Sequence, residues 1–203
     1  MKTPRVRSGL KVHPMIARLF GRLMRGIHAG EEKLIWNQPA VRSAPETIVL
    51  SSSGFQNGAA IPTRFAARSI GENQSPPLEW SNLPSGTAEI VLIMEDPDAP
   101  LPVTSMHLVV TGVSPRTSRL PAGSLNSGRQ SSQVRLGKGL MGRRGYAGPM
   151  PPPSHGPHRY VFQVFALDQT LRTDIAFDRK SLLREIDGKV LARGRLIGTF
   201  ERK

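Results

Sequence analysis

The sequence predicts a mainly β protein: an antiparallel β-sandwich with a few peripheral helices and an N-terminal amphipathic helix. Three observations favour this class. The strongest strand candidates, residues 89–95 and 159–167, are apolar without alternation or rich in aromatic and β-branched side chains, which is typical of strands buried on both faces. Turn-forming Gly, Pro and Asn residues are scattered along the chain. Only two segments have helical periodicity.

The first expected element is the amphipathic helix. Apolar side chains recur at helical spacing from Ile16 to Ile27, three arginines lie toward the other side, and Gly30 is a plausible stop. The apolar stripe needs a partner, and the body of the protein or a second copy is the simpler one. An anionic membrane surface is the alternative. We divide the chain into this basic arm, residues 1–45, and a β-sandwich domain, residues 46–203.

From residue 47 onward the sequence has β character. Residues 48–52 predict a strand, and residues 106–110 predict another buried strand after the one at 89–95. The segment 114–148 is rich in Gly, Ser, Pro and Arg, so it predicts long loops of the kind that often carry function.

The second helix is expected near the end of the chain. Apolar residues within 182–191 form one helical face, Asp178 or Ser181 provides a start signal, and Gly194 provides a stop. Residues 196–200 then predict a final strand.

Composition excludes several classes of function. The 203 residues include no cysteine, which excludes disulfides, thiolate metal ligands and cysteine nucleophiles. The apolar runs are far shorter than the roughly 20 residues that span a bilayer. Arginines interrupt the apolar residues near the N-terminus, so we expect no secretory signal and take a cytoplasmic location as the default.

The net charge of +13 is unevenly distributed. Residues 1–45 hold nine Lys or Arg against two Glu, and residues 99–167 hold eight Lys or Arg and no acid. Such a field favours anionic partners. Nucleic acid is not expected, because the strongest aromatic cluster lies within a core strand rather than among basic residues on a surface.

Two rigid motifs flank the strongest strand candidates. One is Asp-Pro-Asp-Ala-Pro at 96–100, and the other is Gly-Pro-Met-Pro-Pro-Pro-Ser-His-Gly-Pro-His-Arg-Tyr at 148–160. Proline restricts the backbone and glycine permits unusual conformations, so both segments can hold polar side chains in set directions at strand ends. Either alone is an ordinary turn or loop, but together they predict a binding site.

The ionisable residues of these motifs suggest an anion pocket. Asp96 and Asp98 are two residues apart, and close carboxylates repel, so we expect a proton or a cationic partner. The candidate partners are His107, His155, His158 and Arg159. A histidine bonded to an aspartate is held as a donor, and its outward nitrogen can bind a phosphate or carboxylate oxygen. A satisfied core histidine remains the alternative interpretation of His107.

Enzymatic interpretations have less support. A metal-assisted hydrolase using His107, His155 and His158 is an alternative, but Gly-Pro between the last two prevents the helical spacing of a zinc site. No Gly-x-Ser-x-Gly motif is present, and Asp96 and Asp98 are too close to flank a glycosidic bond. We therefore expect a binding protein without catalytic residues, metal or cofactor.

The paired motifs resemble those of the phosphatidylethanolamine-binding protein family, specifically its bacterial Raf-kinase-inhibitor-like branch. The likeness covers roughly residues 47–201. It includes Ser-Pro-Pro-Leu-Glu-Trp at 75–80, both rigid motifs, His107 leading a strand, and Gly-Thr-Phe-Glu at 198–201. The family often has an aromatic residue shortly before the strand histidine, where this sequence has Thr104-Ser105-Met106.

The resemblance implies a β-sandwich with a small pocket for phosphate-bearing ligands or phospholipid head groups. Asp96 and Asp98 would support the pocket, which would be lined by His107, Pro149, His158 and Tyr160. We expect such a protein to regulate a protein partner and to form a homodimer. The alternative is a basic interaction protein whose arm acts on an acidic partner or a membrane surface.

Overall fold

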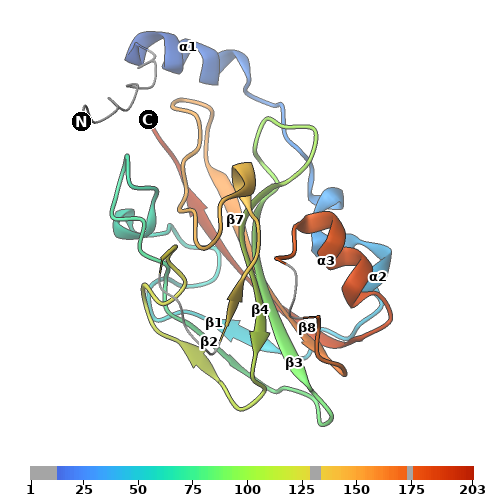
Figure 1. Cartoon of the computed structure of the whole chain (residues 1–203). Helices are drawn as coiled ribbons and strands as arrows, with labels where there is room; N and C mark the ends of the chain where they lie inside the picture. The colour runs from blue at the N-terminus through green and yellow to red at the C-terminus, as the bar shows by residue number, and fades with distance from the viewer. Residues whose placement is uncertain (1–12, 129–133, 173–175) are drawn as a thin grey trace, which may run out of the picture.

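The computed structural model describes residues 13–128, 134–172 and 176–203. Two antiparallel sheets pack against each other, and helices cover the outer face of the larger sheet (Figure 1). The smaller sheet has the strand order β1-β2-β5, and the larger has the order β6-β4-β3-β7-β8. The predicted β-sandwich with peripheral helices is therefore confirmed.

The predicted strands at 48–52, 89–95, 106–110 and 159–167 correspond to β1, β3, β4 and β7. The strands are β1 (Val49–Ser51), β2 (Leu78–Ser81), β3 (Glu89–Asp96), β4 (Ser105–Val113), β5 (Arg119–Leu120), β6 (Arg135–Leu136), β7 (His158–Leu167) and β8 (Val190–Phe200). The helices are α1 (Pro14–Leu23), α2 (Pro39–Arg42) and α3 (Arg179–Ile186).

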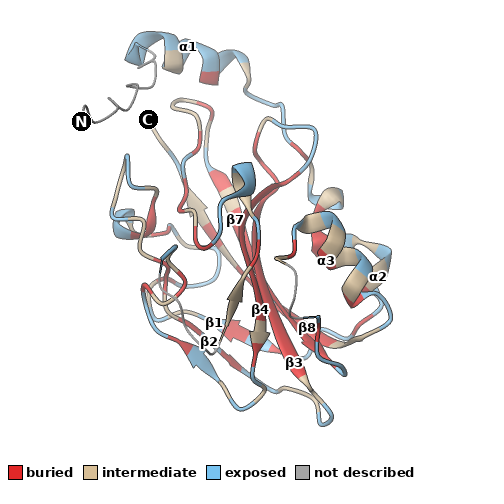
Figure 2. Ribbon diagram, viewed as in Figure 1, coloured by how far each residue is buried: buried red, intermediate tan, exposed pale blue. Residues whose placement is uncertain are grey.

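The central strands β3 and β7 are buried along nearly their whole length (Figure 2). Side chains on their inner face fill the core between the sheets, including Ile90, Leu92, Met94, Tyr160, Phe162 and Val164. Side chains on their outer face join a second core with α3, including Val91, Ile93, Val161, Phe165, Leu182 and Ile186. Burial on both faces explains why these strands are apolar without alternation.

The C-terminal helix is shorter than the sequence predicted. Its start is as expected, because Asp178 caps α3 and exchanges hydrogen bonds with Ser181 in a capping box. It ends at Ile186, just before Gly188, whose φ of 73° suits a helix terminus. Gly194 lies inside β8, where a Cβ atom would strike the backbone of Ile48. The predicted stop was therefore wrong: this glycine permits close approach of two backbones.

The N-terminal arm contains two different kinds of structure. Leu34, Ile35, Trp36 and Val41 are buried in the outer core, so this part of the arm packs against the sandwich. By contrast, α1 lies at one end of the molecule, and most of its side chains are exposed (Figure 2). The body of the protein leaves the apolar stripe of α1 uncovered. The proposed division at residue 45 stays a prediction.

Candidate anion-binding site

The ends of three neighbouring strands bring the predicted site residues together. Asp96 is the last residue of β3, and His158 is the first residue of β7. Glu95 pairs with Val161, so the next residues along, Asp96 and Tyr160, both belong to the opposite face of the sheet. Tyr160 is part of the core between the sheets, which identifies this as the inner face.

A β-bulge directs His107 to the same place. In the β3–β4 pairing Met94 is opposite Leu108 and Glu95 is opposite Met106, which leaves His107 as an extra residue. Such bulges change the direction of a side chain relative to regular alternation. The His107 ring accordingly meets the Tyr160 ring edge to face, with centroids 5.2 Å apart.

His107 is held in one protonation state. Its Nδ1 lies 2.7 Å from the carbonyl oxygen of Ala147, which can only accept, so Nδ1 carries a proton. Burial lowers the pKa of His107, and this effect outweighs the opposing influence of Asp96. The ring is therefore neutral near pH 7, with an unprotonated Nε2.

A chain of hydrogen bonds joins Asp96 to the end of α1. Asp96 Oδ1 accepts from the backbone N–H of Asp98, and Oδ2 lies 2.8 Å from His158 Nδ1. His158 Nε2 lies 2.8 Å from His155 Nδ1. His155 Nε2 in turn lies 2.9 Å from the carbonyl oxygen of Met24. The nitrogen of His158 that was expected to face a ligand therefore contacts His155 instead.

The proton positions in this chain follow from its end groups. The Met24 carbonyl can only accept, so His155 Nε2 carries a proton. Burial and the charge of His158 lower the pKa of His155, which favours its neutral form with an accepting Nδ1. His158 then donates from Nε2 to His155 and from Nδ1 to Asp96. In this arrangement the His158 imidazolium and the Asp96 carboxylate form an ion pair, and both side chains are buried.

Asp98 has a different partner from Asp96. Its carboxylate accepts hydrogen bonds from the backbone N–H, Nε and Nη2 of Arg159, at 2.8, 2.9 and 2.8 Å. Burial acts to raise the pKa of Asp98, but the hydrogen bonds and charge of Arg159 hold it below its usual value. The two aspartates thus have different partners, and the Asp98 carboxylate anchors the start of β7 instead of bonding to His107, His155 or His158.

Tyr160 supplies a polar group with no obvious structural use. Its side chain is completely buried, and its hydroxyl makes no hydrogen bond of standard geometry among the residues that the structure describes, although Asp96 and the backbone of Met150 lie near it. Burial and the Asp96 carboxylate raise the pKa of Tyr160, so the hydroxyl keeps its proton. Tyr146 is the contrasting case: it is also buried, but its hydroxyl donates to the Phe65 carbonyl at 2.8 Å.

The 148–160 motif is itself firmly held. Gly148 N–H donates to Asn73 Oδ1 at 2.8 Å, and the Pro149 carbonyl accepts from Ala67 N–H at 3.0 Å. Pro149 is buried and lies two residues beyond Ala147, the partner of His107. The structure thus places Pro149 in a fixed loop that continues from the cluster.

Sequence reasoning missed the contribution of the N-terminal arm. Residues 28–30 pack along the loop at 97–99: His28 Nδ1 lies 3.2 Å from the Asp98 carbonyl, Ala29 N–H donates to Ala99, and Gly30 N–H donates to Pro97. These contacts, like that of Met24, use mostly backbone groups. Backbone groups are common to all residues, so no sequence signal identifies them.

The described segments offer no other ligand set. Among them, no three His, Asp or Glu side chains are arranged to hold a metal ion. His155 and His158 point ring nitrogens at each other, and His107 Nδ1 bonds to the Ala147 carbonyl. The three histidines that a metal-assisted hydrolase would need as ligands therefore do not form a metal-binding group among the described residues. Within the same segments, the helices are too short or too polar to cross a bilayer.

The fold and the strand-end cluster define a class of β-sandwich protein with a buried polar site at one end. The sequence profile of the family described as "Phosphatidylethanolamine-binding protein" matches residues 51–201. This match covers well over half of the chain. The chain belongs to the phosphatidylethanolamine-binding protein family.

Relatives and solved structures agree with this assignment. The chain is 38% identical over 152 residues to a UPF0098 protein of Aquifex aeolicus, covering 74% of this chain and 86% of that protein. It is 36% identical over 154 residues to the UPF0098 protein PH1269 of Pyrococcus horikoshii, covering 75% and 76%. The crystal structure of the phosphatidylethanolamine-binding protein homologue CT736 from Chlamydia trachomatis matches with a TM-score of 0.69 at 32% identity, covering 78% and 99%. The fold of E. coli YbcL is also similar, with a TM-score of 0.72 at 24% identity, covering 77% and 99%.

Proposed function

We propose that the protein binds phosphate-bearing small molecules or phospholipid head groups at the inner-face cluster, defined as Asp96, His107, His158 and Tyr160. The observation that carries the proposal is the buried hydroxyl of Tyr160, which makes no hydrogen bond of standard geometry among the described residues. A buried donor without a partner costs about 1–3 kcal/mol, so proteins seldom retain one without a use. A phosphate oxygen would satisfy it.

The charges of the cluster are suited to this ligand. The imidazolium of His158 donates from Nε2 to His155, and a ligand oxygen could take the place of His155 as the acceptor. The aspartate behind His158 keeps that proton in place. Binding through His158 therefore requires His155 to move, and the contact between His155 and Met24 opposes that movement.

The protonation state of His107 determines which ligand groups it can bind. In its neutral form Nε2 can only accept, so it can receive a hydrogen bond from a protonated ligand group such as an ammonium or a phosphate hydroxyl. To contact a fully ionised phosphate it must take up a proton, against the burial that lowers its pKa. We therefore expect affinity for inorganic phosphate to fall as the pH rises, with the fall beginning below the ordinary histidine pKa of 6.5.

The test is calorimetric titration of phosphate, phosphoethanolamine and a short-chain phosphatidylethanolamine into the wild type, Tyr160→Phe and His158→Gln. Loss of one hydrogen bond costs about 0.5–1.5 kcal/mol, so we expect Tyr160→Phe to weaken binding by about two- to twelvefold. We expect His158→Gln to weaken it further, since it also removes a charge.

Tyr146→Phe is the matched control. It removes the hydroxyl from another buried tyrosine, but this hydroxyl already donates a hydrogen bond to the Phe65 carbonyl. Affinity should be unchanged in this variant. The proposal fails if the wild type binds none of the three ligands, or if both tyrosine variants bind like the wild type.

The expected protein partner and homodimer belong to the same proposal. Family membership supports a ligand-binding role, and we propose that ligand occupancy is coupled to a protein partner. Sedimentation of the purified protein with and without phosphoethanolamine checks the homodimer and its dependence on ligand.

A further inference from the structure

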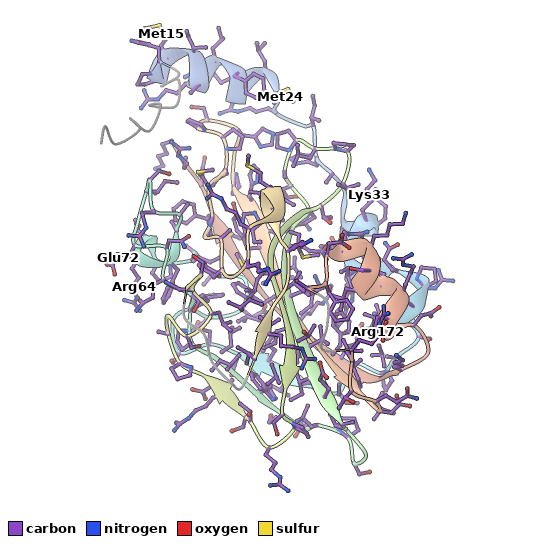
Figure 3. All side chains as sticks on the ribbon, in the orientation of Figure 1. Met15, Met24, Lys33, Arg64, Glu72 and Arg172 are labelled. Carbon is purple, nitrogen blue, oxygen red and sulfur yellow. The ribbon has the colours of Figure 1, made fainter. Side chains whose placement is uncertain are left out.

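The apolar stripe of α1 faces away from the rest of the protein. The helix contacts the body through Gly21, where a Cβ atom would strike the Pro153 carbonyl. The large apolar side chains lie on the remaining surface: Met15, Ile16, Leu19, Phe20 and Leu23 are each more than half exposed. Figure 3 shows Met15 and Met24 near the two ends of α1, which lies across one end of the molecule. The stripe is thus available to a partner.

A basic groove lies beside this stripe. It separates α1 from the last residues of the chain and has a volume of about 440 Å³. Its lining consists of Arg18, Arg22, Arg25, Ser154, Glu201 and Lys203. Four of these six residues are cationic and only one is anionic. Arg25 Nε donates to the Ser154 carbonyl at 2.8 Å, which helps to hold the helix at this distance from the loop below it.

We propose that α1 and the basic groove form a docking surface for an anionic lipid bilayer. The stripe inserts among the acyl chains at the interface, and the groove takes the phosphate groups of anionic lipids. Helices that lie in the membrane interface combine an apolar face with Lys or Arg beside it, and anionic lipids strengthen their binding. The arrangement in α1 has both features on the outer surface of a folded domain.

Charge favours a bilayer over a second copy of the chain. The three arginines of α1 lie toward the other side of the helix from the stripe, and residues 13–30 contain no acid that could neutralise them. Packing two stripes together would bring these arginines no opposite charge. The phosphates of an anionic bilayer would supply it.

This surface is separate from the inner-face cluster, so the inference does not depend on the proposed ligand. The primary measurement is co-sedimentation of the full chain with phosphatidylcholine vesicles, with and without phosphatidylglycerol. We expect binding only when phosphatidylglycerol is present, and weaker binding at high salt, because salt screens exposed charges.

Two double variants test the two parts of the surface. Arg18→Ala with Arg22→Ala removes two groove cations, each worth about fivefold in affinity near an anionic surface, so we expect a loss on the order of 25-fold. Leu19→Ser with Leu23→Ser leaves the charge unchanged but removes apolar area, and we expect a loss of at least about tenfold. The control is Arg42→Ala with Arg116→Ala, which removes the same charge from exposed positions outside α1 and the groove. It should bind nearly as well as the wild type.

Insertion has a spectroscopic readout. Trp36 and Trp80 are both buried, so their emission should not respond to vesicles. In Phe20→Trp, phosphatidylglycerol vesicles should shift the emission of the added tryptophan to the blue, and lipids brominated on their acyl chains should quench it. A basic segment held by charge alone would give neither signal.

Three results would overturn the inference. One is equal binding to vesicles with and without phosphatidylglycerol, or none to either. Another is vesicle binding by the Leu19→Ser, Leu23→Ser variant that is as strong as that of the wild type. The third is a dimer that this variant dissociates, because a second copy would then cover the stripe. Phosphate titration of the same variants should still show binding at the inner-face cluster, since neither variant changes a residue of that cluster. This titration distinguishes failure of the membrane-docking inference from failure of the proposed ligand site.

Discussion

Glu95 and Asp96 are neighbours at the end of β3, but they face opposite sides of the sheet and have opposite kinds of surroundings. On the helix side, Glu95 accepts from Ile35 N–H and Gln163 Nε2 at 2.8 Å each, from Thr104 Oγ1 at 2.6 Å and from Arg179 Nε at 3.3 Å. All four acceptor positions of this buried carboxylate are occupied. Nothing further can bind there without breaking an existing bond.

On the inner side, the polar groups around Asp96 are only partly satisfied. Asp96 and His158 pair with each other, but the Tyr160 hydroxyl makes no hydrogen bond of standard geometry within the described segments. Buried polar groups are retained either because a complete network stabilises the fold or because a ligand completes it. The difference teaches that adjacent residues of one strand can face a complete hydrogen-bond network on one side of the sheet and an incomplete one on the other.

The largest expected effect comes from breaking the complete network. Glu95→Ala leaves Arg179 and three other donors without their acceptor, and removal of one partner of a buried ion pair costs about 3–5 kcal/mol. Urea unfolding should show this loss. Glu185→Ala is the control, because Glu185 pairs with Arg172 and Lys189 near the surface, where such pairs are worth about 1 kcal/mol or less. Similar losses in both variants would contradict the comparison.

The next effect is the contribution of His107, on the inner face, to the pH dependence of stability. Because the pKa of buried His107 is lowered from 6.5, the unfolded chain binds more protons than the folded chain once the pH drops toward that value. Stability is therefore fully present above about pH 6.5 and declines as the pH falls toward the folded-state pKa, by at most about 1.4 kcal/mol per pH unit.

His107→Gln should reduce this slope. The measurement is urea unfolding of the wild type and His107→Gln at several pH values between the ordinary histidine and carboxylate ranges. Identical slopes in the two proteins would show that His107 is not the group responsible.

A smaller effect separates the two buried tyrosines. Tyr146→Phe leaves the Phe65 carbonyl without its donor, so we expect a loss of about 1 kcal/mol in the free energy of unfolding. Tyr160→Phe removes a hydroxyl that makes no hydrogen bond of standard geometry among the described residues, so stability should be unchanged or slightly higher. Thermal unfolding of the two variants makes the comparison. An equal loss in Tyr160→Phe would mean that its hydroxyl is bonded in the free protein.

The smallest expected effect concerns the Asp98 anchor. Arg159→Lys removes the two-pronged geometry but keeps the charge, and because the arginine side chain is 41% exposed, we expect a loss of about 1 kcal/mol or less. Lysine should also allow the pKa of Asp98 to rise toward its usual value. NMR titration of the Asp98 carboxyl would detect that change, and an unaltered pKa would assign the shift to another cause.

Sequence alone determined the strands, because burial on both faces leaves a local signature in β3 and β7. It also singled out Asp96, His107 and His158 as candidates, because the two motifs place ionisable residues beside Pro and Gly at strand ends, whereas Tyr160 followed from the family resemblance. The N-cap of α3 was equally local, because Asp178 and Ser181 are three residues apart.

Tertiary structure alone decided how these parts are used. The bulge at His107 depends on its pairing with β3, and the role of Gly194 depends on the backbone of Ile48, far away in the chain. The contact between His155 and Met24, and the outward direction of the α1 stripe, likewise depend on how separate segments pack. Local sequence encodes periodicity and propensity, but the choice of neighbours is a property of the whole fold, because contacts between distant segments leave no regular spacing in either one.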